Sequence, residues 1–124
     1  MLKSAEINRL VRRILRELGL PQAEAQVFFL PNQELCKLKH TYFKKDVAYV
    51  DVLAFPEPKQ FPHPESSQRV LGEVYLNREL RREPRELVQL LIHGILHLLG
   101  YRHQKKDDTI RMQRKAKQIW AQIS

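Results

Sequence analysis

The strongest pattern in this chain of 124 residues is a histidine-rich stretch near the C-terminus, Ile92-His93-Gly94-Ile95-Leu96-His97-Leu98-Leu99-Gly100-Tyr101-Arg102-His103. Because His93 and His97 are four residues apart, a helix places both rings on the same face, one turn apart. Gly100 is expected to end that helix, since glycine readily adopts the left-handed conformation that closes a helix C-terminus. The chain then turns, and His103 can come back to meet the other two rings.

Three neutral imidazoles, those of His93, His97 and His103, make a three-nitrogen site that suits zinc. Three protein ligands leave the fourth tetrahedral position open to water, which is typical of catalytic sites and not of closed structural ones. Zinc lowers the pKa of a bound water to about 7, which gives a hydroxide nucleophile at neutral pH. We therefore expect one Zn²⁺ per chain at these side chains.

Two other interpretations of the histidines stay open, namely core histidines on an apolar helix and a purely structural metal. Against the first, only two of the five histidines, His40 and His63, lie outside this stretch. Zinc proteases of the H-E-x-x-H type carry a general-base glutamate directly after the first ligand, where this chain has Gly94. Peptide hydrolysis by that route is therefore not expected.

Length and composition predict one globular domain over residues 1–124. The hydrophobic fraction of 43% and the charged fraction of 29% are typical of a soluble protein. No run reaches the roughly 18 apolar residues of a membrane span, and the N-terminus lacks a signal-peptide core. The single cysteine, Cys36, excludes an internal disulfide and indicates a reducing cytoplasm. We expect Cys36 to be a small buried residue.

The net charge of +8 favours a polyanionic partner. Basic residues cluster at 37–45 and 105–117 with few compensating acids, whereas glutamates alternate with the arginines of 78–85. Charge of this kind favours nucleic acid over a surface that only keeps the protein soluble.

Hydrophobic periodicity predicts four helices and three strands. Helices are expected over 4–18 with Ser4 as N-cap, from the cap Asn32 through Tyr42, over 84–99 and from about 107. Strands are expected over 26–30, 49–55 and 70–76, with a loop over 56–68. Strands that alternate with helices indicate a small α/β sandwich.

The expected helix over 84–99 carries one apolar face, and the histidines lie nearly opposite it, as ligands lining a cleft do. The members of that face are Val88, Leu91, Ile92, Ile95 and Leu99. The last helix is expected to supply core contacts through Met112, Ala116, Ile119, Trp120 and Ile123.

Residues 93–103 resemble the H-G-x-L-H-L-x-G-Y-D-H signature of the YbeY family of bacterial metal-dependent endoribonucleases. Two further blocks are similar to family strands: residues 51–56 to T-D-V-L-S-F-P, and residues 71–74 to L-G-D-I. Met112 falls where the family has a methionine in its last helix.

This resemblance implies a zinc-dependent, single-strand-specific endoribonuclease that acts in 16S ribosomal RNA 3′-end maturation and ribosome quality control. Its implied partners are ribosomal RNA and the ribosome, and its location is cytoplasmic. It also implies an α/β fold with a small mixed β-sheet packed with helices. The three-histidine metal site would lie on a core helix and the following turn, in a single YbeY-like metallohydrolase domain.

The chain departs from the family pattern at several positions. Phe43 stands where the family has an arginine important for activity, and Arg102 replaces an aspartate. Val50 and Ala54 replace a threonine and a serine, and there is one extra residue before Asp51.

The resemblance and the charge pattern make Lys44, Lys45 and Arg102 the candidate RNA-binding residues. Arg102 is also the candidate catalytic residue, because it is adjacent to His103. Lysine lacks the bidentate fork with which arginine grips phosphate. Three functions stay open: an RNA hydrolase, a catalytically weakened ribosome- or RNA-binding module that keeps a structural metal, and an amide hydrolase, against which Gly94 counts.

Overall fold

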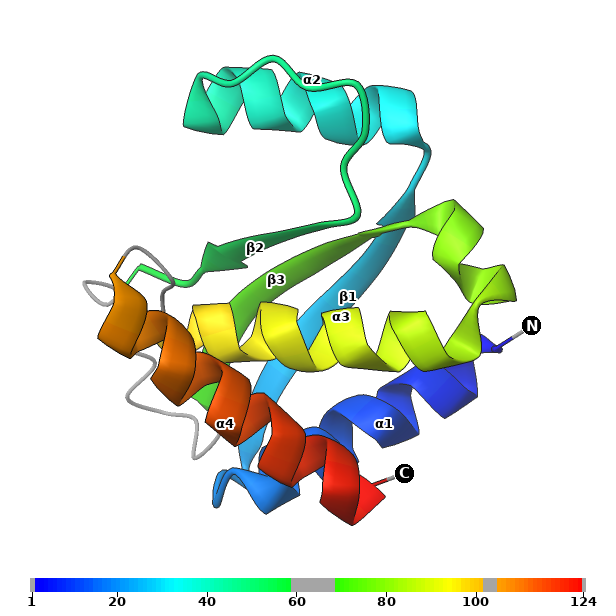
Figure 1. Cartoon of the computed structure of the whole chain (residues 1–124). Helices are drawn as coiled ribbons and strands as arrows, with labels where there is room; N and C mark the ends of the chain where they lie inside the picture. Colours follow the sequence, from blue (N-terminus) through cyan, green and yellow to red (C-terminus); the bar gives the residue numbers. More distant parts are fainter. Residues whose placement is uncertain (1, 59–68, 102–104, 124) are drawn as a thin grey trace.

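The computed structural model of the chain describes residues 2–58, 69–101 and 105–123. Its elements appear in Figure 1 in the order α1 (Ser4–Glu17), β1 (Ala23–Leu30), α2 (Asn32–Phe43), β2 (Val52–Pro56), β3 (Arg69–Asn77), the 3-10 helix η1 (Arg78–Arg82), α3 (Pro84–Leu98) and α4 (Lys106–Ile123). The predicted succession of helices and strands is confirmed, and η1 is an addition to it. Within these described ranges, no helix is long and apolar enough to cross a membrane.

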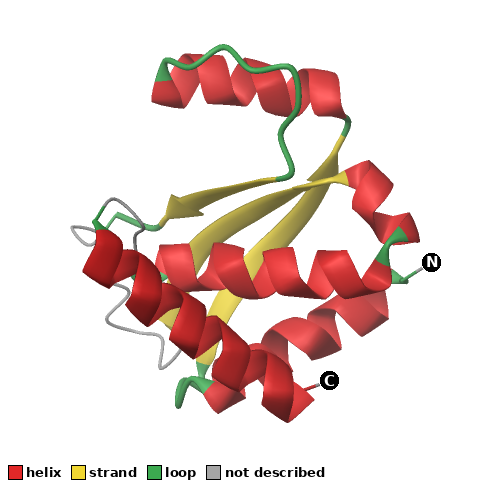
Figure 2. Ribbon diagram, in the orientation of Figure 1, coloured by secondary structure: helices red, strands yellow, loops and turns green. Residues whose placement is uncertain are grey.

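The three strands form one mixed sheet in the order β1-β3-β2. β1 runs parallel to β3, and β2 runs antiparallel to it. Helices α1, α3 and α4 cover one face of the sheet, and α2 lies over the other (Figure 2). The mixed α/β fold implied by the family resemblance is therefore confirmed.

The main core lies between the sheet and the three helices α1, α3 and α4. The apolar stripe of α1 points into it, as the sequence periodicity predicts. The buried surface of α3 is wider than the predicted face. Leu87, Leu96 and Leu98 are buried in addition to three predicted residues, Leu91, Ile92 and Ile95, whereas the predicted Val88 and Leu99 are half-buried. The reason is that α3 lies between the sheet and α4, so it needs apolar side chains in two directions (Figure 1).

Two predicted helix caps are wrong by one residue. Ser4 is the first residue of α1 and Lys3 is its N-cap; the Glu6 carboxylate accepts a hydrogen bond from the Lys3 backbone N–H at 3.3 Å. Similarly, Pro31 is the N-cap of α2, and Asn32 is its first residue. The Asn32 side chain therefore serves another purpose than capping.

The predicted strand over 49–55 is also wrong at its start, because β2 begins only at Val52. Two asparagines bind the backbone of the preceding segment. The Val50 N–H donates to Asn32 Oδ1 at 3.0 Å, and Asn77 Nδ2 donates to the Val50 carbonyl at 3.0 Å. Asn32 Nδ2 also donates to the Ala48 carbonyl at 2.9 Å. Because the two asparagine side chains bind both the N–H and the carbonyl of Val50, these backbone groups are not available for pairing with β3.

Candidate metal centre

Helix α3 brings two of the three predicted ligands together. The Nε2 atoms of His93 and His97 are 2.9 Å apart, and their ring planes meet at 75°. Both side chains are half-buried on a helix that is otherwise mostly buried. The four-residue spacing read from the sequence therefore produces the expected juxtaposition of ring nitrogens.

A backbone carbonyl fixes the orientation of the second ring. His97 Nδ1 lies 2.9 Å from the carbonyl oxygen of Tyr101. A carbonyl oxygen only accepts hydrogen bonds, so His97 donates through Nδ1–H. In the neutral ring, Nε2 then carries the lone pair, and it faces His93. Metal-binding histidines are commonly oriented in this way by a hydrogen bond from the other ring nitrogen.

The turn at Gly100 supplies that carbonyl. The Gly100 N–H donates to the His97 carbonyl and the Tyr101 N–H donates to the Leu96 carbonyl, at 3.0 Å and 3.1 Å. This double hydrogen bond is a Schellman motif, which requires a left-handed residue, and Gly100 has a φ of 95°. The predicted helix stop is confirmed, and the same turn orients a predicted ligand.

Close packing of α3 against the sheet leaves no space for a side chain at Gly94. A Cβ atom at this position would lie 2.7 Å from Val74 Cγ1 and 3.3 Å from Val52 Cγ2. The residue after His93 therefore faces β3 and β2 at close range, and a glutamate side chain has no room there. The packing of α3 on the sheet therefore explains why position 94 carries no glutamate of the zinc-protease type.

The two ring nitrogens that the structure describes are compatible with a shared zinc ion. Two nitrogens each about 2.0–2.1 Å from a tetrahedral zinc would lie about 3.3 Å apart, close to the separation of the His93 and His97 nitrogens. The third predicted ligand, His103, and the neighbouring Arg102 lie outside the described residues. In the part of the chain that is described, no cluster of three or more His, Cys, Asp or Glu side chains is placed to hold a metal.

His93 also borders a groove of about 580 Å³ between α3 and α4. Trp120 and Lys117 line its α4 side, and Gln89 lines its α3 side. The Arg85 guanidinium lies 5.8 Å from the centre of the Trp120 ring. Trp120 packs against the main core, as the sequence predicts, and it is also half-buried at the wall of this groove.

The lysines predicted to bind RNA lie elsewhere. Lys44 follows the last residue of α2 in the left-handed conformation, with a φ of 56°, and Lys45 comes next. Both side chains are exposed. α2 lies across the sheet from α3 (Figure 1), so the structure does not gather these lysines and the histidines on one face of the sheet.

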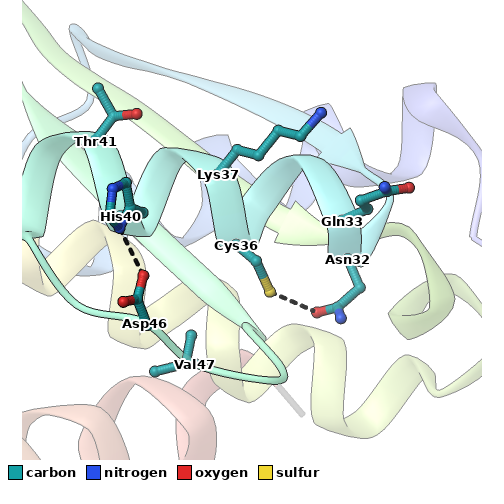
Figure 3. Close-up of a pocket in the computed structure, with 8 residues that line it drawn as sticks. All are labelled: Asn32, Gln33, Cys36, Lys37, His40, Thr41, Asp46 and Val47. Atoms are coloured by element: carbon teal, nitrogen blue, oxygen red, sulfur yellow. Dashed lines mark hydrogen bonds and ion pairs between the residues drawn. The ribbon is translucent and has the colours of Figure 1, made fainter.

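Beside α2 lies a second pocket of about 670 Å³ (Figure 3). His40 and Asp46 point towards each other in it, with 2.6 Å between Nδ1 and Oδ1. Cys36 is half-buried, and its thiol lies 3.7 Å from Asn32 Oδ1. Asn32 and the His40–Asp46 pair thus connect α2 to the segment that carries Lys44 and Lys45, a role that no local sequence pattern signals.

Comparison with known proteins agrees with the histidine motif. The sequence model of the family "Endoribonuclease YbeY" matches residues 2–124. An Aquifex aeolicus endoribonuclease YbeY is 36% identical over 109 residues, which cover 81% of this chain and 69% of the relative. An Anaeromyxobacter endoribonuclease YbeY is 35% identical over 114 residues, covering 85% of this chain and 57% of the relative.

The fold has a counterpart among solved structures as well. The solution structure of TM1509 from Thermotoga maritima superposes with a TM-score of 0.53 at 21% identity, over 98% of this chain and 87% of that one. This likeness concerns the fold alone. The match of the family model over nearly the whole chain, together with the relatives above 30% identity, decides the relationship: the chain belongs to the YbeY family of endoribonucleases.

Proposed function

We propose that this protein is a zinc-dependent endoribonuclease that cleaves single-stranded RNA in the cytoplasm. Its role would lie in 16S ribosomal RNA 3′-end maturation and ribosome quality control, with ribosomal RNA and the ribosome as partners. Family membership supports the reaction class. The observation that carries the proposal is the convergence of the His93 and His97 Nε2 atoms, with His97 held by the Tyr101 carbonyl.

In this proposal His93, His97 and His103 hold one Zn²⁺. When bound, zinc supplies Lewis acidity that polarises a phosphoryl oxygen and activates water. Arg102, adjacent to His103 in sequence, grips the scissile phosphate and stabilises the charge that develops on it. Lys44 and Lys45 hold phosphates of the RNA strand on the other side of the sheet.

One observation favours a second candidate, a ribosome- or RNA-binding module with weakened catalysis and a structural metal. At the position of the family arginine, the Phe43 ring packs against Phe55 with 5.7 Å between ring centroids. The cation that lies over that ring is an ammonium group, Lys39 Nζ, 5.2 Å from the ring centre. An ammonium group lacks the bidentate grip of a guanidinium.

Zinc content tests the site. Purified wild type is expected to hold about one zinc ion per chain, and His93→Ala and His97→Ala are each expected to lose it, since a site reduced to two protein ligands holds zinc weakly. His40→Ala is the matched control, because His40 lies on a helix but pairs with Asp46. Elemental analysis after dialysis gives the stoichiometry. Full zinc content in His93→Ala and His97→Ala would show that the site assignment is wrong.

Cleavage separates the two functions. Zinc-loaded wild type should cut a single-stranded RNA, and His97→Ala should reduce the rate to background, as measured by gel electrophoresis of end-labelled RNA. If fully loaded wild type cuts model and ribosomal RNAs no faster than His97→Ala does, the endoribonuclease proposal is wrong; RNA binding without cleavage would then identify the binding module.

A further inference from the structure

Five aromatic rings form a continuous row on the face of the sheet that α2 covers. Each strand contributes one ring, and the C-terminal end of α2 contributes two. We call this set the aromatic row: Phe28, Tyr42, Phe43, Phe55 and Tyr75. The histidine pair lies on α3, and α3 and α2 cover opposite faces of the sheet (Figure 1).

The ring contacts run without a break from β1 to α2. Phe28 stacks on Tyr75 with centroids 5.0 Å apart and planes inclined by 21°. Tyr75 meets Phe55 edge-on at 5.5 Å. Phe55 in turn contacts Tyr42 at 5.3 Å and Phe43 at 5.7 Å. Because the rings hold one another in place, a ligand that stacks on them meets a preformed surface.

Both ends of the row are open to solvent. The exposed fraction is 40% for Phe28, 64% for Tyr42 and 42% for Phe43. Among the described residues, six large hydrophobic side chains are exposed, and three of these six belong to the row. Exposure that gathers on one side of a molecule marks an interaction surface, whereas single scattered residues do not.

Positive charge lies beside the row. Lys39 Nζ is 5.2 Å from the centre of the Phe43 ring, and Lys37, Lys44 and Lys45 are exposed on α2 and the segment after it. The one acid among residues 37–46, Asp46, is paired with His40, and the Glu73 carboxylate beside the row accepts a hydrogen bond from Tyr75. A ligand that matches both features has flat rings to stack and a chain of negative charges.

We propose that the aromatic row is a base-stacking surface for single-stranded RNA, with Lys39 and its neighbours against the phosphates. The choice of RNA as the ligand rests on the proposed function. A duplex does not fit, because its bases stack on one another, whereas a single strand can splay its bases onto Phe28 and Phe43. The row would thus hold bases of a strand whose cleavage takes place elsewhere on the protein.

The test is equilibrium binding by fluorescence anisotropy of zinc-loaded protein. The probe is a short nuclease-resistant single strand of 2′-O-methyl RNA, and its partner is an abasic strand of equal length. Phe28→Ala and Phe43→Ala are each expected to weaken binding of the base-bearing strand by roughly 5- to 100-fold. Binding of the abasic strand should hardly change, and neither should the salt dependence, because no phosphate contact is lost.

Two controls accompany these variants. Ile110→Ala removes a side chain as exposed as Phe43, at 42%, from a helix that carries no part of the row, and should bind both strands like wild type. Phe28→Tyr keeps a stacking ring, so this variant should bind the base-bearing strand like wild type. Thermal melts by circular dichroism confirm that Phe28→Ala and Phe43→Ala are folded at the assay temperature.

Equal losses on the base-bearing and abasic strands, or no loss, would overturn the proposal. So would sedimentation data in which Phe28→Ala turns a dimer into a monomer, since the row would then bind a second copy of the chain. The binding assay needs no cleavage. A protein that binds through the row but never cuts refutes the proposed function alone, and one that cuts RNA but ignores these substitutions refutes the stacking surface alone.

Discussion

The two faces of the sheet are covered to very different depths. Counted over the described residues, the core shared with α1, α3 and α4 contains seventeen buried hydrophobic side chains. The cluster beneath α2 contains three: Leu35, Val50 and Leu53. Since hydrophobic stabilisation scales with the apolar area removed from water, we infer that the α3 face supplies most of the free energy of folding.

The depth of packing on each face suits the site that we propose there, a metal site on the α3 face and a ligand-binding surface on the α2 face. The histidines project from a helix packed on both sides, which suits metal ligands because their geometry must be held within a fraction of an ångström. The aromatic row lies where the cover is thin, so its rings stay within reach of a ligand. The face that stabilises the fold thus carries the proposed chemistry, and the sparsely covered face carries the proposed recognition.

Removing one buried leucine from each face gives the largest expected effect. Leu91 on α3 and Leu35 on α2 are both 0% exposed. Leu91→Ala should lower the free energy of unfolding by about 3–5 kcal/mol, because α3 is enclosed by the sheet and α4 and cannot collapse around the cavity. Leu35→Ala should cost about 2–3 kcal/mol, since the thinly covered α2 side can relax. Urea denaturation measures both. A larger loss for Leu35→Ala would contradict the comparison of the two faces.

A methyl group at Gly94 probes how closely α3 packs on the sheet. Overpacking typically costs about 1–3 kcal/mol, against a gain of up to about 1 kcal/mol in helix propensity. We expect Gly94→Ala to lower the free energy of unfolding by about 1–2 kcal/mol, because the new Cβ would meet Val74 Cγ1 at 2.7 Å.

A double-mutant cycle with Val74→Ala checks the cause of that loss. Removing the valine methyl groups makes room for the new Cβ, so the two losses together should fall short of their sum. Strict additivity would show that the cost of Gly94→Ala arises elsewhere than at the contact between α3 and β3.

Local spacing predicts α3 and its histidines because both depend on residues close in sequence. Pro84 at the first turn and Gly100 after the last fix the ends of the helix, and i, i+4 geometry alone brings the rings of His93 and His97 together. Local spacing could not predict that β2 begins only at Val52. It depends on Asn32 and Asn77, which reach Val50 from 18 and 27 residues away.

The aromatic row shows the same limit. Its five rings come from four elements, and only the pairing of β1 and β2 with β3 sets them side by side. In the sequence Phe28 and Phe55 read as ordinary residues of buried strands, and a single sequence shows neither the order of strands nor which face a helix leaves uncovered. Hydrophobic periodicity shows which face of a helix or strand is apolar, whereas tertiary packing decides which other element covers that face.

The smallest expected effect concerns a phenol within the row. The hydrogen bond that Tyr75 donates to the Glu73 carboxylate, with partial burial, raises the pKa of Tyr75 to about 12 from an ordinary 10.0. Because folding raises this pKa, the bond contributes its full stabilisation below about pH 10 and loses it as the pH rises towards 12. Ultraviolet titration of native protein should therefore show a late-ionising tyrosine that is missing in Tyr75→Phe and ionises earlier in Glu73→Gln.

Tyr49→Phe is the matched control. Burial, followed by the Asp51 charge, raises the pKa of Tyr49, so removal of the Tyr49 phenol should leave the Glu73-sensitive step in place. An identical high-pH titration in wild type and Tyr75→Phe would mean that the phenol is not held by Glu73, and that the centre of the row is less rigid than its ring contacts indicate.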